Sequence, residues 1–579
     1  MDAIVRRAED ARQDPRLFGP EPEIPYLMRS PLESLAAAAF VTEDEGFAAK
    51  TLEGIETWLS FPADEWVARP HRPMYCDHAL LNVAAMVGIA LDLCAPLWPD
   101  GAAASVRDRL QSYAIHRFIE TWRKKEVHWA SPDYHENWKI MCCGEAGTAA
   151  LASAESVEDL REILTACLEG VLDVLDGVPD EGDWPEGANY WIETLGHGLR
   201  FGVGLRIATE GQVNLFRHPA LQVTGDYFVH VTEPDGEIYN YNDNAVPIGR
   251  KVDYLLLLAR ENGRPDWAWT ARMGDPVTLE RLAWDDPGLE SVPPAGPDTS
   301  RLFPVTGLVT MRSGWDGQAT YVGFKSGPSN VGHSHLDANS FVLSARGKRL
   351  LVDGGTWPYA HFLGFFGHDT RFNFDGNNTI AHSTLMVDGR GQRLGAEYPG
   401  RIASFEPGPE VDIAVGDAAA AYAGSLTAFF RALAFVKPDL LLVYDQVAAD
   451  ELRLLEWLFQ HTGTAEGDER LTTICLDGVS LSLMRVLPEE SECWRTSDVA
   501  RTSAYTSSNA GIPERVGIRY RSFGPFHPCE EAQVLWAIHV GDHKEKPRVE
   551  ATTGDSTVDA GITWPDGKQM SVEIQRHRI

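Results

Sequence analysis

A chain of 579 residues is too long for one ordinary domain, and with 44% hydrophobic residues it has material for sizeable cores, so we expect two large globular domains. A formal net charge of −33 argues against a generic attraction to nucleic acid or to an anionic membrane. An anionic substrate would need cations gathered locally against this overall field. The candidates are Arg72, Lys139, Arg200 and Arg371.

The N-terminal sequence and the cysteine pattern indicate the compartment in which the protein is found. The N-terminus lacks the apolar core of a secretory signal, and no later run is expected to reach the roughly 18 to 20 apolar residues of a membrane span. The eight cysteines are scattered without CxxC spacing, which indicates reduced, mostly buried thiols. As given, the sequence predicts a cytoplasmic protein without a nucleic-acid or membrane partner, or a periplasmic or secreted one if a signal was removed. A homo-oligomer is left open.

The first half of the sequence predicts helices, because apolar residues recur at three- and four-residue spacing. Short breaks between them predict serial helical hairpins. The expected helices are 32–40, 47–59, 77–94, 102–123, 137–154, 157–175 and 190–207, with further pieces at 220–230, 251–260 and 265–273.

Residues 275–304 are rich in Pro, Gly and Asp and predict a domain junction. Strand-like runs separated by turn residues follow it. They are 305–312, 319–324, 340–345, 349–352, 383–387, 412–415, 429–436, 440–447, 452–460, 517–522, 534–539 and 570–575. The sequence therefore predicts a helical domain, 1–300, followed by an antiparallel β domain, 301–579.

His333, His335 and Asp337 stand at every second position before a predicted hairpin. In an extended segment alternate side chains point to the same side, so we expect one polar, metal-competent face here. With Asp353 and His382 from neighbouring strands, His335 would complete a two-histidine, one-carboxylate set suited to Zn²⁺ with water as a fourth ligand. Hydrogen-bonded structural histidines are the alternative.

Three further polar segments each allow two interpretations. In 133–138, Asn137 is either the N-cap of a helix, with Trp138 as a packing residue, or an amide that donates to a substrate carboxylate. In 181–191, Glu186 can support the first helical turn, and Tyr190 is either a packed tyrosine or a phenol acting as acid or base. Residues 239–244 are either a sugar-binding loop or a turn-rich connector.

Taken in this order, the motifs resemble the heparinase II/III-like polysaccharide lyases, a group that includes related alginate lyases. The most specific stretches are 332–341, 347–355 and 381–389, supported by Asn137 and by 186–190. The resemblance implies an N-terminal incomplete α/α toroid followed by a C-terminal antiparallel β-sandwich. It also implies an enzyme that removes the C5 proton of a uronic acid and breaks the bond from C4 to the glycosidic oxygen, leaving an unsaturated uronate end.

The resemblance assigns roles in this β-elimination. Asn137 would neutralise the substrate carboxylate, Tyr190 would protonate the departing oxygen, and His333 would be the base, with His135 as a weaker candidate. The division of base and acid among His333, His135 and Tyr190 stays open. The expected substrate-binding residues are Trp138, Glu186, Arg72 and Arg371. The implied metal set is His335, Asp353 and His382, which would hold a structural divalent ion, zinc first and manganese or calcium as alternatives.

The expected substrate is an anionic oligo- or polysaccharide that contains uronic acid, with glycosaminoglycan first and alginate next. Several relatives carry a histidine directly after the asparagine, where this chain has Trp138, so the tolerance of both uronate epimers is not implied. One alternative is a toroid glycoside hydrolase, whose two carboxylates would come from Glu136, Asp183 and Glu186. The other is a non-catalytic polysaccharide-binding protein.

Overall fold

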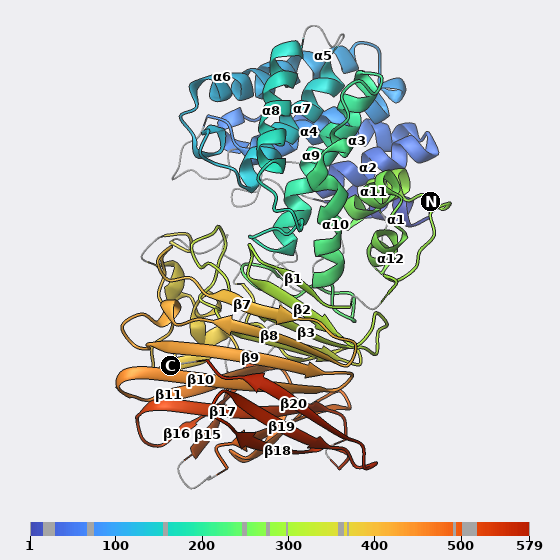
Figure 1. Ribbon diagram of the computed structural model, residues 1–579. Coiled ribbons are helices and arrows are strands. Elements are labelled where there is room, and N and C mark those ends of the chain that lie inside the picture. Colours follow the sequence, from blue (N-terminus) through green and yellow to red (C-terminus); the bar gives the residue numbers. More distant parts are fainter. Residues whose placement is uncertain are drawn as a thin grey trace. The chain divides into compact units, whose positions relative to one another are not determined.

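The computed structural model describes residues 2–14, 29–66, 75–154, 160–245, 252–273, 278–296, 299–356, 364–367, 370–489, 494–500, 518–542 and 544–577. The chain divides into two compact units (Figure 1). The first comprises Met1–Gly182, Tyr190–Gly225 and Arg250–Ser291, and the second comprises Asp183–Asn189, Asp226–Gly249 and Val292–Ile579. Two short segments from before residue 300 thus cluster with the second unit.

The first half of the chain is helical, as predicted. The expected helices begin at or near their predicted positions, whereas Asp2–Ala11 and Leu279–Trp284 were not expected. The range 102–123 is a nearly continuous run in which a π-helical turn, Gln111–Ile115, joins α5 to α6. The helices are α1 (Asp2–Ala11), α2 (Arg29–Thr42), α3 (Glu45–Trp58), α4 (His78–Cys94), α5 (Ala102–Leu110), α6 (His116–Lys124), α7 (Asn137–Ser153), α8 (Arg161–Leu175), α9 (Ala188–Ala208), α10 (Pro219–Val231), α11 (Asp253–Asn262), α12 (Pro265–Arg272) and α13 (Leu279–Trp284).

Helix α4 corrects one expectation. Asp77 caps its start by accepting hydrogen bonds from the backbone of Ala79 and Leu80. The helical stretch His78–Leu97 is long and apolar enough to cross a membrane, although the sequence was expected to contain no such run. In the most apolar 18-residue part of this stretch, 67% is buried inside the protein, as is typical of a helix in a hydrophobic core.

The second unit consists of antiparallel sheets. A nine-stranded sheet has the order β1-β2-β3-β4-β5-β11-β16-β15, and β6 pairs with β11 beside this path. Its strands are β1 (Arg301–Phe303), β2 (Leu308–Arg312), β3 (Thr320–Lys325), β4 (Ser340–Ala345), β5 (Lys348–Leu351), β6 (Leu385–Val387), β11 (Leu455–His461), β15 (Trp494–Ala500) and β16 (Arg519–Pro525).

An eight-stranded sheet has the order β12-β13-β14-β17-β10-β9-β8-β7, and a three-stranded sheet has the order β18-β19-β20. Their strands are β7 (Arg401–Glu406), β8 (Val411–Asp417), β9 (Ala428–Val436), β10 (Leu440–Arg453), β12 (Thr464–Gly467), β13 (Leu471–Leu476), β14 (Val479–Leu487), β17 (Cys529–Val540), β18 (Arg548–Thr553), β19 (Thr557–Thr563) and β20 (Gln569–Gln575). The predicted class, a helical half followed by an antiparallel sandwich, is confirmed.

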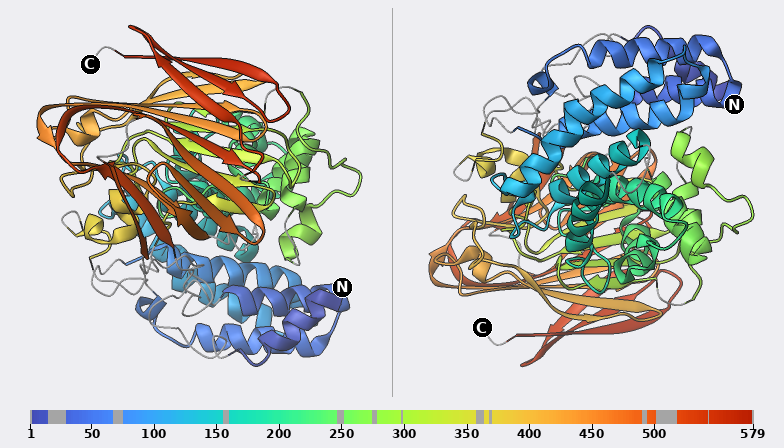
Figure 2. Two further views of the ribbon diagram at one scale, coloured as in Figure 1. Left: turned by 90° about the horizontal axis from the view of Figure 1, so that it is seen from below. Right: turned by 90° about the horizontal axis from the view of Figure 1, so that it is seen from above.

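Strand β9 shows why these sheets stack in layers. Phe429, Leu433 and Phe435 belong to the core that the eight-stranded sheet shares with the nine-stranded sheet. Ala432 and Ala434, at the alternate positions, belong to a second core shared with β18–β20. Since successive strand side chains point to opposite faces, a strand buried on both faces carries apolar residues at most positions. Figure 2 shows the red three-stranded sheet outside the orange strands.

Candidate functional site

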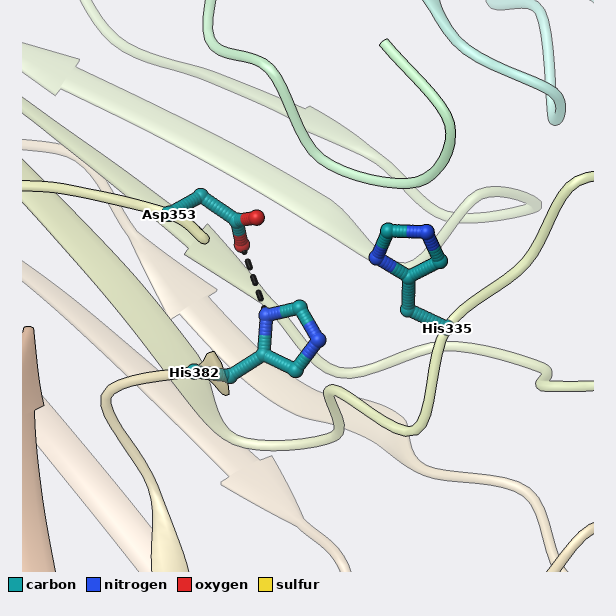
Figure 3. Close-up of side chains that lie close together, drawn as sticks. All are labelled: His335, Asp353 and His382. Carbon is teal, nitrogen blue, oxygen red and sulfur yellow. Dashed lines mark hydrogen bonds and ion pairs between the residues drawn. The ribbon is translucent and has the colours of Figure 1, made fainter. Parts of the chain in front are cut away.

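The structure brings His335, Asp353 and His382 together in the second unit (Figure 3). The three side chains are buried, and their potential ligand atoms lie within 4.8 Å of one another. They come from the loop before β4, the segment after β5 and the segment before β6. His335 and His382 are nearly fifty positions apart in the sequence, yet they lie in one cluster with Asp353. The resemblance implied the same set.

Backbone hydrogen bonds hold these three segments side by side. Leu336 N donates to Asn377 O over 3.0 Å, and Gly354 N donates to Ala381 O over 3.1 Å. Gly354 permits this close approach, because a Cβ there would lie 2.7 Å from the Cβ of Ala381. The loops that carry the three side chains are therefore tied together through the main chain.

Two imidazole nitrogens in this cluster are buried without a hydrogen-bond partner among the described residues. His382 Nδ1 lies 2.8 Å from Asp353 Oδ2, and its Nε2 is the unpartnered atom. His335 Nε2 lies 3.0 Å from Asp243 Oδ1, and its Nδ1 is the unpartnered atom. Burial lowers the pKa of His335, so this ring is neutral and one of its nitrogens keeps a lone pair.

The donor set fits a divalent transition metal. Two imidazoles and one carboxylate are common ligands of zinc, whereas calcium prefers oxygen atoms alone. Burial tends to raise the pKa of Asp353, but His382 outweighs this effect, so the carboxylate is ionised. Ligand atoms around a tetrahedral zinc lie about 3.3 Å apart. The span of up to 4.8 Å therefore requires the side chains to close by small rotations.

Asp243 connects this cluster to His333. Its Oδ2 lies 2.9 Å from His333 Nδ1 and 2.8 Å from Arg371 Nη2, and its Oδ1 lies 3.0 Å from His335 Nε2 and 3.2 Å from Thr356 Oγ1. Burial alone would raise the pKa of Asp243, but Arg371 and the hydrogen bonds from both histidines hold it well below its usual range. Asp243 is thus a buried carboxylate with four neighbouring donors.

His333 has the geometry of a potential base. An ionised Asp243 can only accept, so His333 Nδ1 carries a proton in that hydrogen bond. In the neutral form of the ring, the lone pair is therefore at Nε2. Glu186 Oε1 lies 3.7 Å from that Nε2, and the ring of Phe366 stands edge-on at 5.3 Å. The His333 side chain is 14% exposed, whereas the Asp243 side chain is fully buried.

His333 and His335 lie close together because both contact Asp243, and not because they share one face of a strand as expected. Residues 331–339 form turns and irregular segments rather than an extended strand, and His333 and Asn339 have φ values of 61° and 58°. Side chains in such turns do not alternate with period two. Asp337, predicted on the same face, instead forms a buried ion pair with Lys325 at 2.9 Å.

The Glu186 loop is packed against the segment that carries Asp243. Asn244 Nδ2 donates to Glu186 O, and Asn244 Oδ1 accepts from Asn189 N over 2.7 Å. Gly187 has a φ of 104°, and a Cβ there would lie 1.9 Å from Asn244 Nδ2. Only glycine fits this position. The loop that precedes Tyr190, a half-buried residue in the first turn of α9, is thus fixed at Asn244.

Asn137 is buried at the first position of α7, so the N-cap expected there is Glu136 instead. Tyr134 donates its hydroxyl to Asn137 Oδ1 over 3.1 Å, which leaves the amide nitrogen as the donor end. His135, half exposed, lies 3.1 Å from Asp173 through Nδ1. This part of the first unit therefore presents an oriented amide next to an exposed imidazole.

Trp138 lies in an aromatic cluster of the first unit. Its ring centroid is 4.4 Å from that of His78 and 4.9 Å from that of His128. The side chain of Trp138 is half-buried and His128 is exposed. The predicted roles of Trp138 and Tyr190 stay predictions, and Arg72 lies outside the described residues.

Comparison with protein families gives a match within the second unit. Residues 295–545 match the family described as Heparinase II/III-like, C-terminal. The expected family is therefore the one whose model this part of the chain matches. The match contains His333, His335, Asp353 and His382. No similar sequence is found among curated proteins.

Solved structures share the fold of the whole chain. A mutant of the heparan sulfate lyase HepC from Pedobacter heparinus is 15% identical with a TM-score of 0.69, over 94% of this chain and 82% of that chain. The heparinase III BT4657 gene product is 14% identical with a TM-score of 0.67, over 95% and 83%. Streptomyces coelicolor A3 chondroitin AC lyase, solved with chondroitin sulphate, is 13% identical with a TM-score of 0.56, over 99% and 88%.

Three of the four cations expected to face a substrate are engaged within the protein, and the fourth, Arg72, lies outside the described residues. Arg371 in the heparinase II/III-like domain donates to Asp243 and to Ser334 O, while its Nη1 is buried without a partner among the described residues. In the first unit, Lys139 pairs with Asp173 at 2.5 Å, and Arg200 pairs with Glu280 at 2.6 Å. Lys139 and Arg200 therefore stabilise helices, and Arg371 orients Asp243.

The acids considered for a hydrolase have different surroundings. Asp183 is fully buried and accepts from the backbone and hydroxyl of Thr306. Glu186 is buried and accepts from Trp184 Nε1 over 3.1 Å. Glu136 is exposed at the start of α7. Asp183 thus has a structural partner.

Sequence reasoning missed Asp243 as a site residue. The segment 239–244 was expected to be either a sugar-binding loop or a connector, and the structure buries all of its residues. The sequence did contain a signal for this residue, because an aspartate among asparagines and tyrosines must find hydrogen-bond partners if the segment is buried. Its partners His333 and His335, about ninety residues later, could not be read from spacing.

Proposed function

We propose that the protein is a polysaccharide lyase that cleaves uronic-acid-containing glycans by β-elimination and leaves an unsaturated uronate at the new non-reducing end. The observation that carries the proposal is the hydrogen bond between Asp243 and His333 Nδ1, because His333 lies within residues 295–545, which match the heparinase II/III-like model. The shared fold with lyases of heparan sulfate and chondroitin supports it. A β-elimination needs a base, a group that stabilises the carbanion-like state, and an acid.

His333 acts as the base in this proposal. Because Asp243 holds the proton on Nδ1, the Nε2 lone pair can take the C5 proton of the uronate. Arg371 keeps Asp243 ionised, so the imidazolium that forms is stabilised by the same carboxylate. This is how a buried carboxylate can favour proton transfer to a neighbouring histidine.

Two residues of the first unit take the other roles. The Asn137 amide nitrogen donates to the substrate carboxylate, which withdraws charge from C5 and makes its proton more acidic. Tyr190 protonates the oxygen that leaves C4. His135, held by Asp173, is the alternative acid, and Trp138 offers a sugar-stacking face.

His335, Asp353 and His382 would hold a divalent metal, with zinc the best fit to their atoms. When bound, such an ion supplies a positive centre that joins three separate loops. His335 stands two residues from His333, so these ligands also keep the loop of the base in place. The proposed role of the site is therefore structural.

The proposed substrate class is glycosaminoglycan first and alginate next. The similar structures named for their substrates act on heparan sulfate and chondroitin, which supports this order. A protein with a formal net charge of −33 must bind a polyanion by local contacts rather than by its overall field.

A substrate panel tests the proposal. The protein is incubated with heparan sulfate, chondroitin sulfate, hyaluronan and alginate, and the products are weighed by mass spectrometry. A lyase gives fragments lighter by one water than the hydrolysis products, with new reducing ends in equal number. Hydrolysis products would contradict the lyase proposal and support a hydrolase. Tight oligosaccharide binding without any product would support a non-catalytic binding protein.

A further inference from the structure

We propose that Asp243 is a positioning residue that sets opposite tautomers on two histidines, with the proton on Nδ1 of His333 and on Nε2 of His335. A single carboxylate would thereby prepare the base and one metal ligand together. The His333 half of this inference rests on the proposed function, whereas the His335 half does not.

The contacts of Asp243 leave its two oxygens no alternative to accepting. Arg371 Nη2, a permanent donor, lies 2.8 Å from Oδ2, next to His333 Nδ1 at 2.9 Å. On the other oxygen, His335 Nε2 lies at 3.0 Å and Thr356 Oγ1 at 3.2 Å. Four donors on two oxygens saturate the carboxylate, so each histidine must point an N–H at it.

The two histidines contact Asp243 through different ring nitrogens, so the carboxylate stabilises a different tautomer on each ring. His333 uses Nδ1, so its lone pair is at Nε2, the nitrogen that faces Glu186 Oε1 at 3.7 Å. His335 uses Nε2, so its lone pair is at Nδ1, which is buried without a partner among the described residues. Each lone pair therefore lies where its proposed role requires it.

The backbone fixes Asp243 for this task. Asp243 N donates to His333 O over 3.1 Å, so the main chains of the two residues are also joined. On its two sides, Asn242 Nδ2 donates to Pro185 O over 2.9 Å and Asn244 Nδ2 donates to Glu186 O over 3.2 Å. Asp243 thus stands on a segment anchored to both the His333 loop and the Glu186 loop.

Asp243→Asn makes a directional prediction. Arg371 needs an acceptor, so the amide oxygen should face Arg371 and His333, and the amide nitrogen should face His335 and Thr356. His335 must then accept at Nε2 and carry its proton on Nδ1, the atom that would bind the metal. We expect His333 to keep its tautomer and His335 to lose its own, with zinc affinity lowered about 10- to 100-fold.

Nitrogen-15 NMR of histidine-labelled, metal-free protein reads both tautomers, with signals assigned from His333→Gln and His335→Gln. In the wild type we expect Nδ1–H at His333 and Nε2–H at His335, and either opposite tautomer overturns the inference. This measurement uses the wild-type protein, so it tests the predicted tautomers even if Asp243→Asn does not fold.

Zinc titration of Asp243→Asn, followed by chelator competition, gives the second readout. The matched control is Asp412→Asn, because Asp412 is also a buried carboxylate paired with a cation, Lys437 at 3.0 Å. Asp412→Asn should bind zinc like the wild type, and unchanged affinity in a folded Asp243→Asn contradicts the inference. Both readouts are free of substrate, so absent turnover would refute the proposed function while leaving the tautomers and zinc binding to decide on Asp243.

Discussion

His382 Nδ1 and Asp353 Oδ2 lie 2.8 Å apart in a buried pair, which directs the other ring nitrogen of His382, Nε2, away from the carboxylate. The same carboxylate accepts from Gly355 N through Oδ1 over 2.9 Å. Asp353 therefore orients His382 and is itself a member of the proposed metal set. This arrangement resembles the carboxylate–histidine pairs that support bound metals.

Removing the proposed metal should destabilise the second unit. Binding to the folded state alone adds about 4 kcal/mol when the free ligand is at 1,000 times its Kd. We expect chelated protein to unfold at a lower temperature, with zinc restoring Tm, and His382→Gln to bind little zinc. His461→Gln is the control, since His461 is equally buried but bonds to Gly463 O. Equal zinc content in His382→Gln and the wild type would refute the site.

Arg431 should be a major stabilising residue of the sandwich. Its guanidinium forms a buried two-bond pair with Asp445, and Nη1 also donates to Asn339 O at 2.7 Å and Ser383 O at 2.8 Å. Arg431→Met leaves Asp445 buried without its cation, although Trp457 Nε1 still donates to it over 2.8 Å. We therefore expect the free energy of unfolding to fall by about 3 to 5 kcal/mol.

The control for Arg431 is another arginine–aspartate pair in the same unit. Arg401 also contacts Asp417 through two nitrogens, but its side chain is 71% exposed. Arg401→Met should cost less than about 1 kcal/mol in the same denaturant titration. Similar losses in the two variants would show that burial does not decide the strength of the Arg431 pair.

Gly187→Ala should disturb the loop that carries Glu186. The new Cβ would collide with Asn244 and would also have to adopt a φ of 104°. We expect a loss of several kcal/mol in the free energy of unfolding, roughly the sum of strain and overpacking. Gly389→Ala is the control, because Gly389 has a φ of 70° but no atom near its added Cβ. The account fails here if Gly187→Ala costs no more than Gly389→Ala.

Glu233 should make stability fall as the pH rises towards neutrality. Burial raises its pKa from 4.5 to about 7, although Arg349 opposes the shift. The folded state therefore binds this proton more tightly than the unfolded chain does. The stability contributed by protonated Glu233 is fully present below about pH 4.5 and is lost as the pH rises through about 7.

The comparison with Glu233→Gln isolates this proton. The wild type should lose a few kcal/mol relative to the variant between pH 5 and pH 8, measured as the difference between two denaturation series. Parallel pH profiles of the two proteins would show that Glu233 is ionised throughout this range.

Local signals in the sequence predicted much of the fold. Arg346 and Gly347 predicted a hairpin turn, and the structure gives both positive φ values between β4 and β5, with Ala345 paired to Lys348. Strands β9 and β10 were also expected, because each contains a run of mostly apolar residues, as is typical of strands buried on both faces. These features depend on residues close together in the chain.

The site was less predictable, since it depends on long-range partners. His335, Asp353 and His382 were grouped as metal-competent side chains from neighbouring predicted strands, and the resemblance implied the same set. The expected common strand face of His333 and His335 was wrong. Their actual link is Asp243, in a segment that could equally be a loop or a connector. Hydrogen bonds between residues about ninety positions apart leave no periodic trace in the sequence.

The most direct measurement is the ultraviolet absorbance of unsaturated uronate during incubation with heparan sulfate, chondroitin sulfate, hyaluronan or alginate. The account predicts rising absorbance with at least one glycan for the wild type, and a loss of turnover of at least about 100-fold in His333→Gln and in Tyr190→Phe with the fold and zinc content retained. Wild-type protein that cleaves a glycan without this absorbance, or full activity in His333→Gln, would contradict β-elimination by this site.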